Sequence, residues 1–221
     1  MRKSHLLAVV VLILAAAPAI TVEFNQQAEP KAADRVDLPA PSRTGGMTLT
    51  DALATRRSVR SFAESKLTQQ ELSQLLWAAQ GITDDKGHRT APSARAQYFL
   101  HLYVATADGF FEYIPAGHKL LKLSVKDLRA GLSSQPAVAA APAVFVIAGD
   151  YDRATQGGRE AGLRWVHLEA GHAAQNLLLQ ATALRLAAVP VGGIQPEQVA
   201  QAASLPPSST PIYLIPVGHA K

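Results

Sequence analysis

Residues 162–186 read GLRWVHLEAGHAAQNLLLQATALRL, and this stretch decides the fold of the chain. At about 3.6 residues per turn, it predicts one long helix with two apolar stripes. One stripe carries Trp165, Leu168, His172, Gln175, Leu179 and Ala183, and the other carries Ala173, Ala174, Leu177, Leu178, Ala181 and Leu184. A helix that is apolar over so much of its surface must be buried on most sides. We therefore expect it at the centre of the fold or at a subunit interface.

The segments on either side of this helix predict a sheet and shorter helices. Runs rich in aromatic and aliphatic residues predict strands at 98–105, 110–114, 119–125, 143–148, 189–193 and 212–218. Helices are expected at 48–57, 68–80 and 196–203. The second of these begins with the capping box Thr68–Glu71 and ends at Gly81. The fold class is α+β, with a mixed sheet flanked by helices.

The N-terminus has the order of residues that is typical of a secretory signal. Arg2 and Lys3 precede an apolar run over residues 6–17, and Ala17-Pro18-Ala19 resembles a cleavage site. The apolar run is short for a membrane span, which needs about 20 residues, although an uncleaved membrane anchor is the alternative. We interpret residues 1–19 as a signal peptide, 20–46 as a linker and 47–221 as one folded domain.

Composition limits the classes of function. The chain has 221 residues, 48% of them hydrophobic, which is enough for a sizeable core. Its formal net charge is +4, and removal of residues 1–19 lowers it to +2 because two cations and no anions are lost. The basic residues are scattered without aromatic interleaving, so no nucleic-acid surface is predicted. The absence of cysteine excludes disulfides, thiolate nucleophiles and Cys-based zinc sites.

Standard motifs for metals, nucleotides and nucleophilic hydrolysis are absent from the sequence. It contains no G-x-G-x-x-G, no P-loop and no G-x-S-x-G. His167 and His172 flank Glu169, but a spacing of five residues places the two imidazoles about 140° apart on a helix, so they would not share a metal. These histidines are interpreted as polar tips at a helix interface, and no metal site is predicted.

The strongest local feature is the run RRSVRSF at residues 56–62. Its three guanidinium groups and two hydroxyls fall where a short helix gives way to an extended segment. Guanidinium groups bind phosphate through paired donors, and serine adds a short hydrogen bond. The alternative is that arginines in a last helical turn interact only with the helix dipole.

Three further segments complete a pattern around this run. TAPSA at residues 90–94 leads into YFLHLYV at 98–104, EAGHAAQNLLLQA occupies 169–181, and VPVGG at 189–193 precedes IPVG at 215–218. In this order, the segments resemble the nitroreductase family of FMN-dependent oxidoreductases over about residues 47–219. The TAPSA segment and the strands after it are most similar to the branch of peptide dehydrogenases that form thiazoles and oxazoles.

The resemblance implies an α+β homodimer with FMN at the subunit interface and a small-molecule electron donor and acceptor. It implies that Arg56, Arg57 and Ser58 hold the phosphate and ribityl end of FMN. Arg60 would lie near N1 and O2 of the ring, where a cation favours the anionic reduced form. Lys221 would be what remains of the basic C-terminal residues that often complete the phosphate site.

For the flavin ring, the resemblance implies that Pro92, Ser93 and Ala94 border it, from across the interface. Gly192 would be the catalytic residue, because its backbone N–H would point at N5, the atom that carries the hydride. Gly193 beside it also allows the main chain to approach the ring closely. The implied reaction is two-electron hydride transfer through N5 by a ping-pong mechanism, because one ring face serves both donor and acceptor.

Four departures from the family pattern bear on this interpretation. Arg95 and Arg185 stand where the relatives usually have glycine, and Phe99 stands where the related branch usually has proline. The chain stops at Lys221, so the basic C-terminus is shortened. These departures keep open a flavin- or ligand-binding protein of the same fold without turnover. The sequence shows no segment for docking a peptide.

We predict an exported protein, periplasmic or extracellular, whose mature chain begins near Ile20 and has no stable membrane insertion. N-terminal sequencing of protein from its native compartment is the measurement. Soluble cytoplasmic protein that retains Met1 would contradict the prediction.

Overall fold

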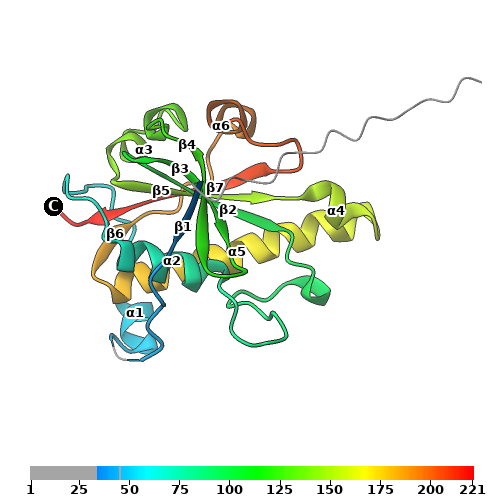
Figure 1. The fold of residues 1–221 in the computed structure, drawn as a ribbon, viewed down its shortest axis with the longest axis horizontal. Coiled ribbons are helices and arrows are strands. Elements are labelled where there is room, and N and C mark those ends of the chain that lie inside the picture. Colours follow the sequence, from blue (N-terminus) through cyan, green and yellow to red (C-terminus); the bar gives the residue numbers. More distant parts are fainter. Residues whose placement is uncertain (1–33, 45) are drawn as a thin grey trace, which may run out of the picture.

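The computed structural model describes residues 34–44 and 46–221, so the signal-peptide prediction lies outside the described residues (Figure 1). The strands are β1 (Arg35–Asp37), β2 (Leu100–Thr106), β3 (Gly109–Ile114), β4 (Lys119–Ser124), β5 (Ala143–Gly149), β6 (Leu186–Ala188) and β7 (Thr210–His219). The helices are α1 (Leu49–Thr55), α2 (Gln69–Gln80), α3 (Pro136–Ala140), α4 (Tyr151–Thr155), α5 (Arg159–Ala183) and α6 (Pro196–Ala203). Short 3-10 turns occupy Ala94–Ala96 and Arg129–Gly131.

The seven strands form one sheet in the order β1-β4-β3-β2-β5-β7-β6. Every pair of neighbouring strands is antiparallel, so the predicted α+β class is confirmed while its mixed sheet is corrected. The one parallel pairing among the described residues is an isolated bridge between Ser58 and Ala188. β2, β3 and β4 follow one another as hairpins, which produces antiparallel pairs.

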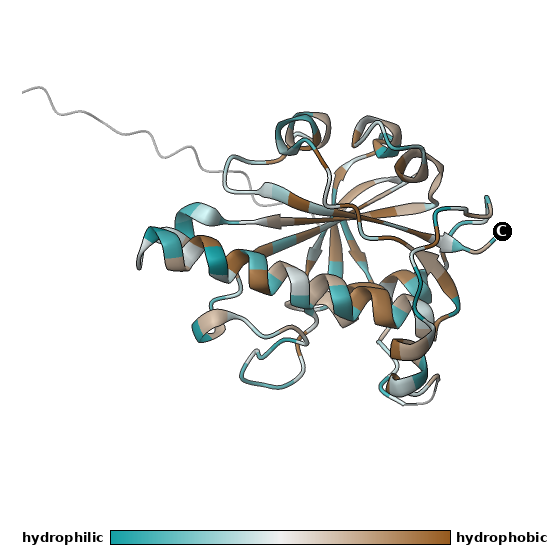
Figure 2. Ribbon diagram, turned by 180° about the vertical axis from the view of Figure 1, so that it is seen from behind, coloured by the Kyte–Doolittle hydropathy of each residue, from teal (hydrophilic) through white to brown (hydrophobic). Residues whose placement is uncertain are grey.

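Helices cover both faces of the sheet. Figure 1 shows α1, α2 and α5 on one side and α3 and α6 on the other. Two buried hydrophobic clusters correspond to these two layers, and β5, which is buried along its whole length, contributes to both. Hydrophobic colour on the strands and on much of α5 in Figure 2 follows the same arrangement.

The long helix α5 forms as predicted, with its start three residues earlier and its end at Ala183. Only one of its two predicted stripes is buried within the chain. Ala173, Leu177 and Ala181 are buried, whereas His172 is exposed and the Leu168 side chain is 54% exposed. Burial on most sides is therefore not reached in one copy of the chain.

The strand at the β6 edge of the sheet begins and ends earlier in the sequence than predicted. The expected strand at 189–193 is replaced by β6 at Leu186–Ala188, and beyond it Val191 makes only an isolated bridge with Leu214. Pro190 lies between them, and a proline has no N–H to donate to a sheet ladder. Residues 192 and 193 are therefore a loop rather than strand.

The predicted linker is wrong in its last part. Arg35–Asp37 form β1, which pairs with β4 at the sheet edge. The chain then lies along α2, where the Ser42 N–H donates to Gln74 Oε1 at 2.8 Å and the Ser73 hydroxyl donates to the Pro39 carbonyl at 2.5 Å. A three-residue strand is too short to show a detectable alternation, so no sequence pattern predicts β1.

The predicted capping box of α2, Thr68 with Glu71, and its end at Gly81 are both confirmed, as is α6 at Pro196–Ala203. The short helices α3 and α4 were not predicted, since five-residue helices carry little periodic pattern. None of the helices in the described part of the chain is long and apolar enough to cross a membrane.

Arg95 and Arg185, which replace the family's glycines, both adopt the left-handed conformation, with φ of 55° and 60°. Glycine reaches this conformation without a steric penalty, whereas a Cβ collides with the neighbouring carbonyl. The exposed Arg185 follows the end of α5 and its N–H donates to the Thr182 carbonyl at 2.9 Å. The turn into β6 is therefore strained.

We predict that Arg185→Gly stabilises the fold by roughly 0.5–1 kcal/mol, because the relief of strain outweighs the greater freedom of glycine in the unfolded chain. Urea unfolding measures the difference. Arg185→Ala, which keeps the Cβ, is the matched control and should show no such gain; equal stability of the two variants would contradict the explanation.

Candidate functional site

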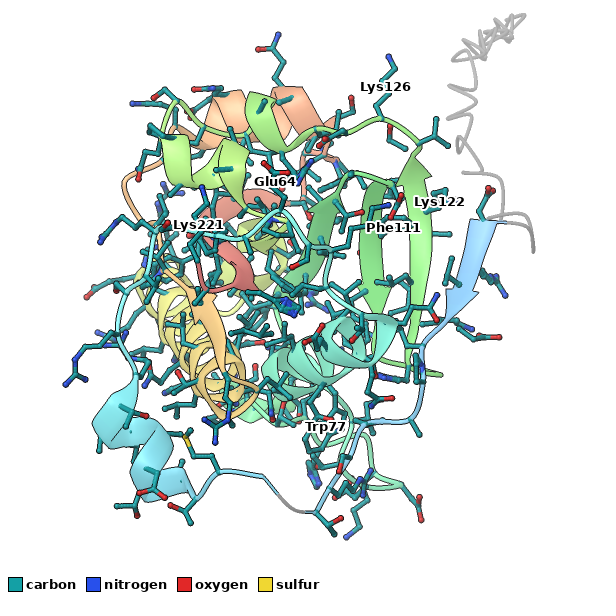
Figure 3. The ribbon with its side chains drawn as sticks, turned by 90° about the vertical axis from the view of Figure 1, so that its left-hand side faces the viewer. Glu64, Trp77, Phe111, Lys122, Lys126 and Lys221 are labelled. Atoms are coloured by element: carbon teal, nitrogen blue, oxygen red, sulfur yellow. The ribbon has the colours of Figure 1, made fainter. Side chains whose placement is uncertain are left out.

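The arginine segment lies against the end of the sheet. α1 ends with Arg56 as its C-cap, and the chain then extends along β6, where the Val59 N–H donates to the Ala188 carbonyl at 3.0 Å. Further on, Phe62 bridges Ala220. In Figure 3, Lys221 marks the chain end that lies beside this segment. The structure therefore brings the Arg56–Arg60 segment and Lys221 to the same edge of the sheet.

The three arginines of this segment differ in their surroundings. Arg57 folds back on its own helix end, donating from Nη1 to the carbonyls of Ala54 at 3.0 Å and Arg56 at 2.8 Å. This is the helix-end interaction that was the alternative to phosphate binding. The side chains of Arg56 and Arg60 donate no hydrogen bond to any described residue. Arg56 and Arg60 therefore have more free donors than Arg57.

The glycine loop that follows Val191 lies at the same edge. Gly192 and Gly193 are exposed, and neither backbone N–H donates a hydrogen bond within the described part of the chain. A Cβ at Gly192 would lie 3.3 Å from the Tyr213 ring, so a larger residue would crowd this turn. Gln135, the residue before α3, donates from Nε2 to the Gly193 carbonyl at 3.0 Å and so fixes the loop. The two free N–H groups are donors that a ligand can use.

Ser93 of the TAPSA segment lies elsewhere, against the first half of α5. Its hydroxyl donates to Glu169 Oε2 at 2.6 Å and accepts from the Tyr98 N–H at 2.8 Å. Glu169 lies 14 residues before the end of α5 at Ala183, which is about 21 Å along a helix. Pro92, Ser93 and Ala94 make no hydrogen bond with the arginine or glycine segments within the described part of one copy.

Glu169 is the centre of a buried polar network. It is 1% exposed and accepts hydrogen bonds from Ser93, from the Phe99 N–H at 3.2 Å and from Gln80 Nε2 at 3.4 Å. Gln80 in turn accepts from Arg89 Nη1 at 3.0 Å. Burial raises the pKa of Glu169, although the hydrogen bonds from Ser93 and Phe99 act in the opposite direction.

The network holds a strained loop. Arg95, Ala96 and Tyr98 all have φ between 51° and 55°, an uncommon conformation for residues with a Cβ. The guanidinium of Arg95 lies 5.3 Å from the centre of the Trp165 ring on α5. Because each such residue costs of order 1 kcal/mol, the surrounding contacts must fix the loop firmly.

Sequence reasoning missed four residues that position these segments: Gln80, Arg89, Gln135 and Glu169. Glu169 was visible as a charged residue on an otherwise apolar helix, a pattern that predicts a buried polar contact. Gln80, Arg89 and Gln135 had no signal, because their partners are far apart in the sequence. Among the residues that the structure describes, no group of three His, Asp or Glu side chains could hold a metal.

The fold is an α+β domain, and this sheet edge carries guanidinium groups and backbone N–H donors that make no hydrogen bond within the described residues. The chain belongs to the nitroreductase family: residues 53–219 match the family described as "Nitroreductase family". A relative from Methanocaldococcus jannaschii that is described as a nitroreductase is 39% identical over 181 residues, covering 77% of this chain and 90% of its own.

Solved structures agree with the family. The crystal structure of a nitroreductase homologue from Ralstonia eutropha JMP134 superposes with a TM-score of 0.81 at 33% identity, covering 85% of this chain and 90% of that one. A homologue from Anabaena variabilis gives 0.74 at 25% identity, covering 85% of this chain and 42% of that longer chain. The Escherichia coli microcin synthetase complex gives 0.68 at 19% identity over 95% of this chain and 85% of that chain, which is a likeness of fold alone.

We predict that Glu169→Ala destabilises the fold by about 3 kcal/mol, because it leaves buried donors of Ser93, Phe99 and Gln80 without an acceptor. Glu169→Gln should cost less, and its difference from the wild type should depend on pH. The folded-state pKa of Glu169 is raised above 4.5, so the wild type loses stability as pH rises from 4.5 through that pKa, and the glutamine variant does not.

Urea unfolding of both variants between pH 4.5 and 8 is the measurement. A difference in unfolding free energy between wild type and Glu169→Gln that stays constant over this range would show that the carboxyl keeps its ordinary pKa. If Glu169→Ala is as stable as the wild type, the network does not contribute to the stability of the fold.

Proposed function

We propose that this protein is an FMN-dependent oxidoreductase that transfers two electrons as hydride between small molecules. Its membership of the nitroreductase family supports an oxidoreductase. The single observation that carries the FMN proposal is the sheet edge where Ser58 bridges Ala188, four residues before the loop whose Gly192 and Gly193 N–H groups are free within the described part of the chain.

The residues at this edge fit the chemistry of FMN. A phosphate needs several donors, and Arg56, Ser58 and Lys221 are available for it at the surface, with Arg57 as a weaker contributor. The glycine loop lets the main chain approach a flat ring, since no side chain stands between them. When bound, FMN would supply a ring that takes up hydride at N5 and returns it.

In such a reaction, the residues of the chain would hold FMN and orient it. The backbone N–H of Gly192 would donate to N5 without using a titratable group, and Gln135 holds the loop that presents it. Arg60 would place a cation near N1 and O2. The electron donor and the acceptor would bind one after the other on the same face of the ring, so we propose a ping-pong mechanism.

The proposed branch, which forms thiazoles and oxazoles on peptides, is a finer prediction that rests on the TAPSA segment alone. The likeness to the microcin synthetase complex is one of fold, and it does not favour this branch over others. The substrate is therefore proposed only as a small-molecule acceptor.

We predict that Arg56→Ala weakens FMN binding by roughly ten- to a hundredfold, since one charge-assisted phosphate contact contributes about 1.5–3 kcal/mol. Arg57→Ala should weaken it less, because Arg57 is already engaged by its own helix end. Arg60→Ala should keep FMN bound and lower its reduction potential, since the reduced ring loses its nearest cation.

Titration with FMN and a redox titration measure these effects. Lys126→Ala is the matched control, because Lys126 is exposed and lies on the opposite sheet edge from Lys221 (Figure 3). Wild-type protein that rejects FMN would overturn the function. Bound FMN that no electron donor reduces would leave the alternative, a flavin-binding protein without turnover.

We also propose that the protein acts as a homodimer through the exposed stripe of α5. Leu168 on α5 and Leu49 and Leu53 on α1 are 54%, 66% and 55% exposed, which is unusual for large apolar side chains gathered near one helix. A second copy would bury this surface. It would also supply the Ser93 segment, which within one copy is bound to Glu169 in the first half of α5.

We predict that Gly171→Glu dissociates the dimer. Gly171 lies at the middle of the exposed stripe, and a Cβ there meets nothing within 4 Å in one copy, so the monomer should tolerate the change. Two charges at a helix–helix contact would oppose association. Light scattering at micromolar concentration is the measurement, with Gly157→Glu, also exposed with an open Cβ position, as control. A wild-type monomer with FMN bound would contradict the dimer.

A further inference from the structure

A cavity opens inside the sheet where β2 and β3 separate. The two strands pair only from Tyr103↔Glu112 to Thr106↔Gly109. Residues 100–102 of β2 pair only with β5, and residues 113–114 of β3 pair only with β4. The gap between them is a cavity of about 180 Å³, room for about six waters at about 30 Å³ each.

Two guanidinium groups line this cavity. Arg89 stacks on the Tyr98 ring, with its Cζ 4.6 Å from the ring centre, and Arg153 lies 5.4 Å from the centre of the Phe99 ring. Arg153 also donates to the Tyr98 carbonyl at 2.5 Å and lies 3.5 Å from Asp150 Oδ2. Arg89 has no carboxylate oxygen within 4 Å among the described residues. A half-buried cation without a counterion is costly, which points to an anionic ligand.

No carboxylate is in direct contact with Arg89; burial lowers the pKa of Arg89, and the charge of Glu169 offsets only part of this effect from beyond contact distance. Glu112 also lines the cavity, but it is bound to His101 Nδ1 at 3.0 Å. Glu169 reaches Arg89 only through Gln80, whose amide accepts from Arg89 and donates to Glu169. This chain of contacts holds the Arg89 guanidinium in one orientation. The site is therefore preorganised for an anion rather than filled by one of the chain's own acids.

The other walls of the cavity select the kind of anion. Tyr98 accepts from the Arg89 backbone N–H at 3.1 Å and keeps its own hydroxyl proton to donate. Leu100, Leu102 and Ile114 supply an apolar wall. Planar guanidinium groups match the two oxygens of a carboxylate, and the apolar wall matches a short carbon body.

We propose that this cavity binds a small carboxylate anion between Arg89 and Arg153, at a site separate from the sheet edge assigned to FMN. Its two cationic walls, Arg89 and Arg153, are not among the residues assigned to FMN, so anion binding can be measured apart from flavin binding and from activity. A test of it can therefore fail while the proposed oxidoreductase function stands, and the reverse also holds.

Isothermal titration of the purified full-length protein with sodium succinate, at constant ionic strength set with chloride, tests the proposal. We expect saturable binding of one succinate per chain. Arg89→Gln and Arg153→Gln should each weaken it by about tenfold or more, because each removes a charge-assisted contact. Lys86→Gln is the matched control, since it removes the same charge from an exposed position in the neighbouring loop, and it should change affinity less than about twofold.

Far-ultraviolet circular dichroism checks that each variant is folded. If Arg89→Gln does not fold, Arg153→Gln still decides, because the Arg153 side chain is 44% exposed. Absence of saturable succinate binding by wild type, or wild-type affinity in Arg153→Gln, overturns the proposal. Inorganic phosphate that binds more tightly than succinate at the same ionic strength overturns the assignment to carboxylates.

Discussion

The packing of α5 against the antiparallel sheet is the constraint on which the rest of the structure depends. Small residues such as Ala173 and Ala181 on its buried stripe let the helix lie close to β5 and β7. Because α5 is 25 residues long, its two ends hold separate parts of the chain in place. The first half of α5 holds the TAPSA loop through Glu169, and the chain continues from the end of α5 into β6 and the glycine loop.

Helix α5 positions two groups of polar residues, one buried and one at the sheet edge. Around Glu169, a carboxyl group is buried and satisfied by three donors, and it fixes a loop that contains left-handed residues. At the sheet edge, by contrast, the exposed Gly192 N–H and the guanidinium of the half-buried Arg56 have no acceptor within the described part of the chain. The first arrangement provides rigidity, and the second provides binding capacity. Membership of the nitroreductase family is consistent with an edge built to hold a ligand.

A single copy of the chain leaves one stripe of α5 uncovered and does not bring together all of the segments expected around the flavin ring. Its second α5 stripe stays exposed at Leu168, and the segments expected around the flavin ring lie at different places along the helix. Both observations have the same physical origin, because a helix against one face of a sheet can bury only the stripe that faces it. The homodimer is the proposal that accounts for both. The residues that line the proposed carboxylate cavity lie outside the set assigned to FMN.

The sequence by itself determined the elements whose signals are local. Helical periodicity predicted α5, the capping box predicted α2, and the apolar runs predicted β2, β3, β4, β5 and β7. The order of four segments, from the arginine run through TAPSA and the 169–181 helix to the glycine motif, was sufficient to indicate the family. The tertiary structure alone decided which α5 stripe is buried, the antiparallel pairing of every strand, β1 as an edge strand, and the Arg89–Gln80–Glu169–Ser93 network. These depend on contacts between residues far apart in the chain, such as Ser93 and Glu169, and no local pattern of residues records such contacts.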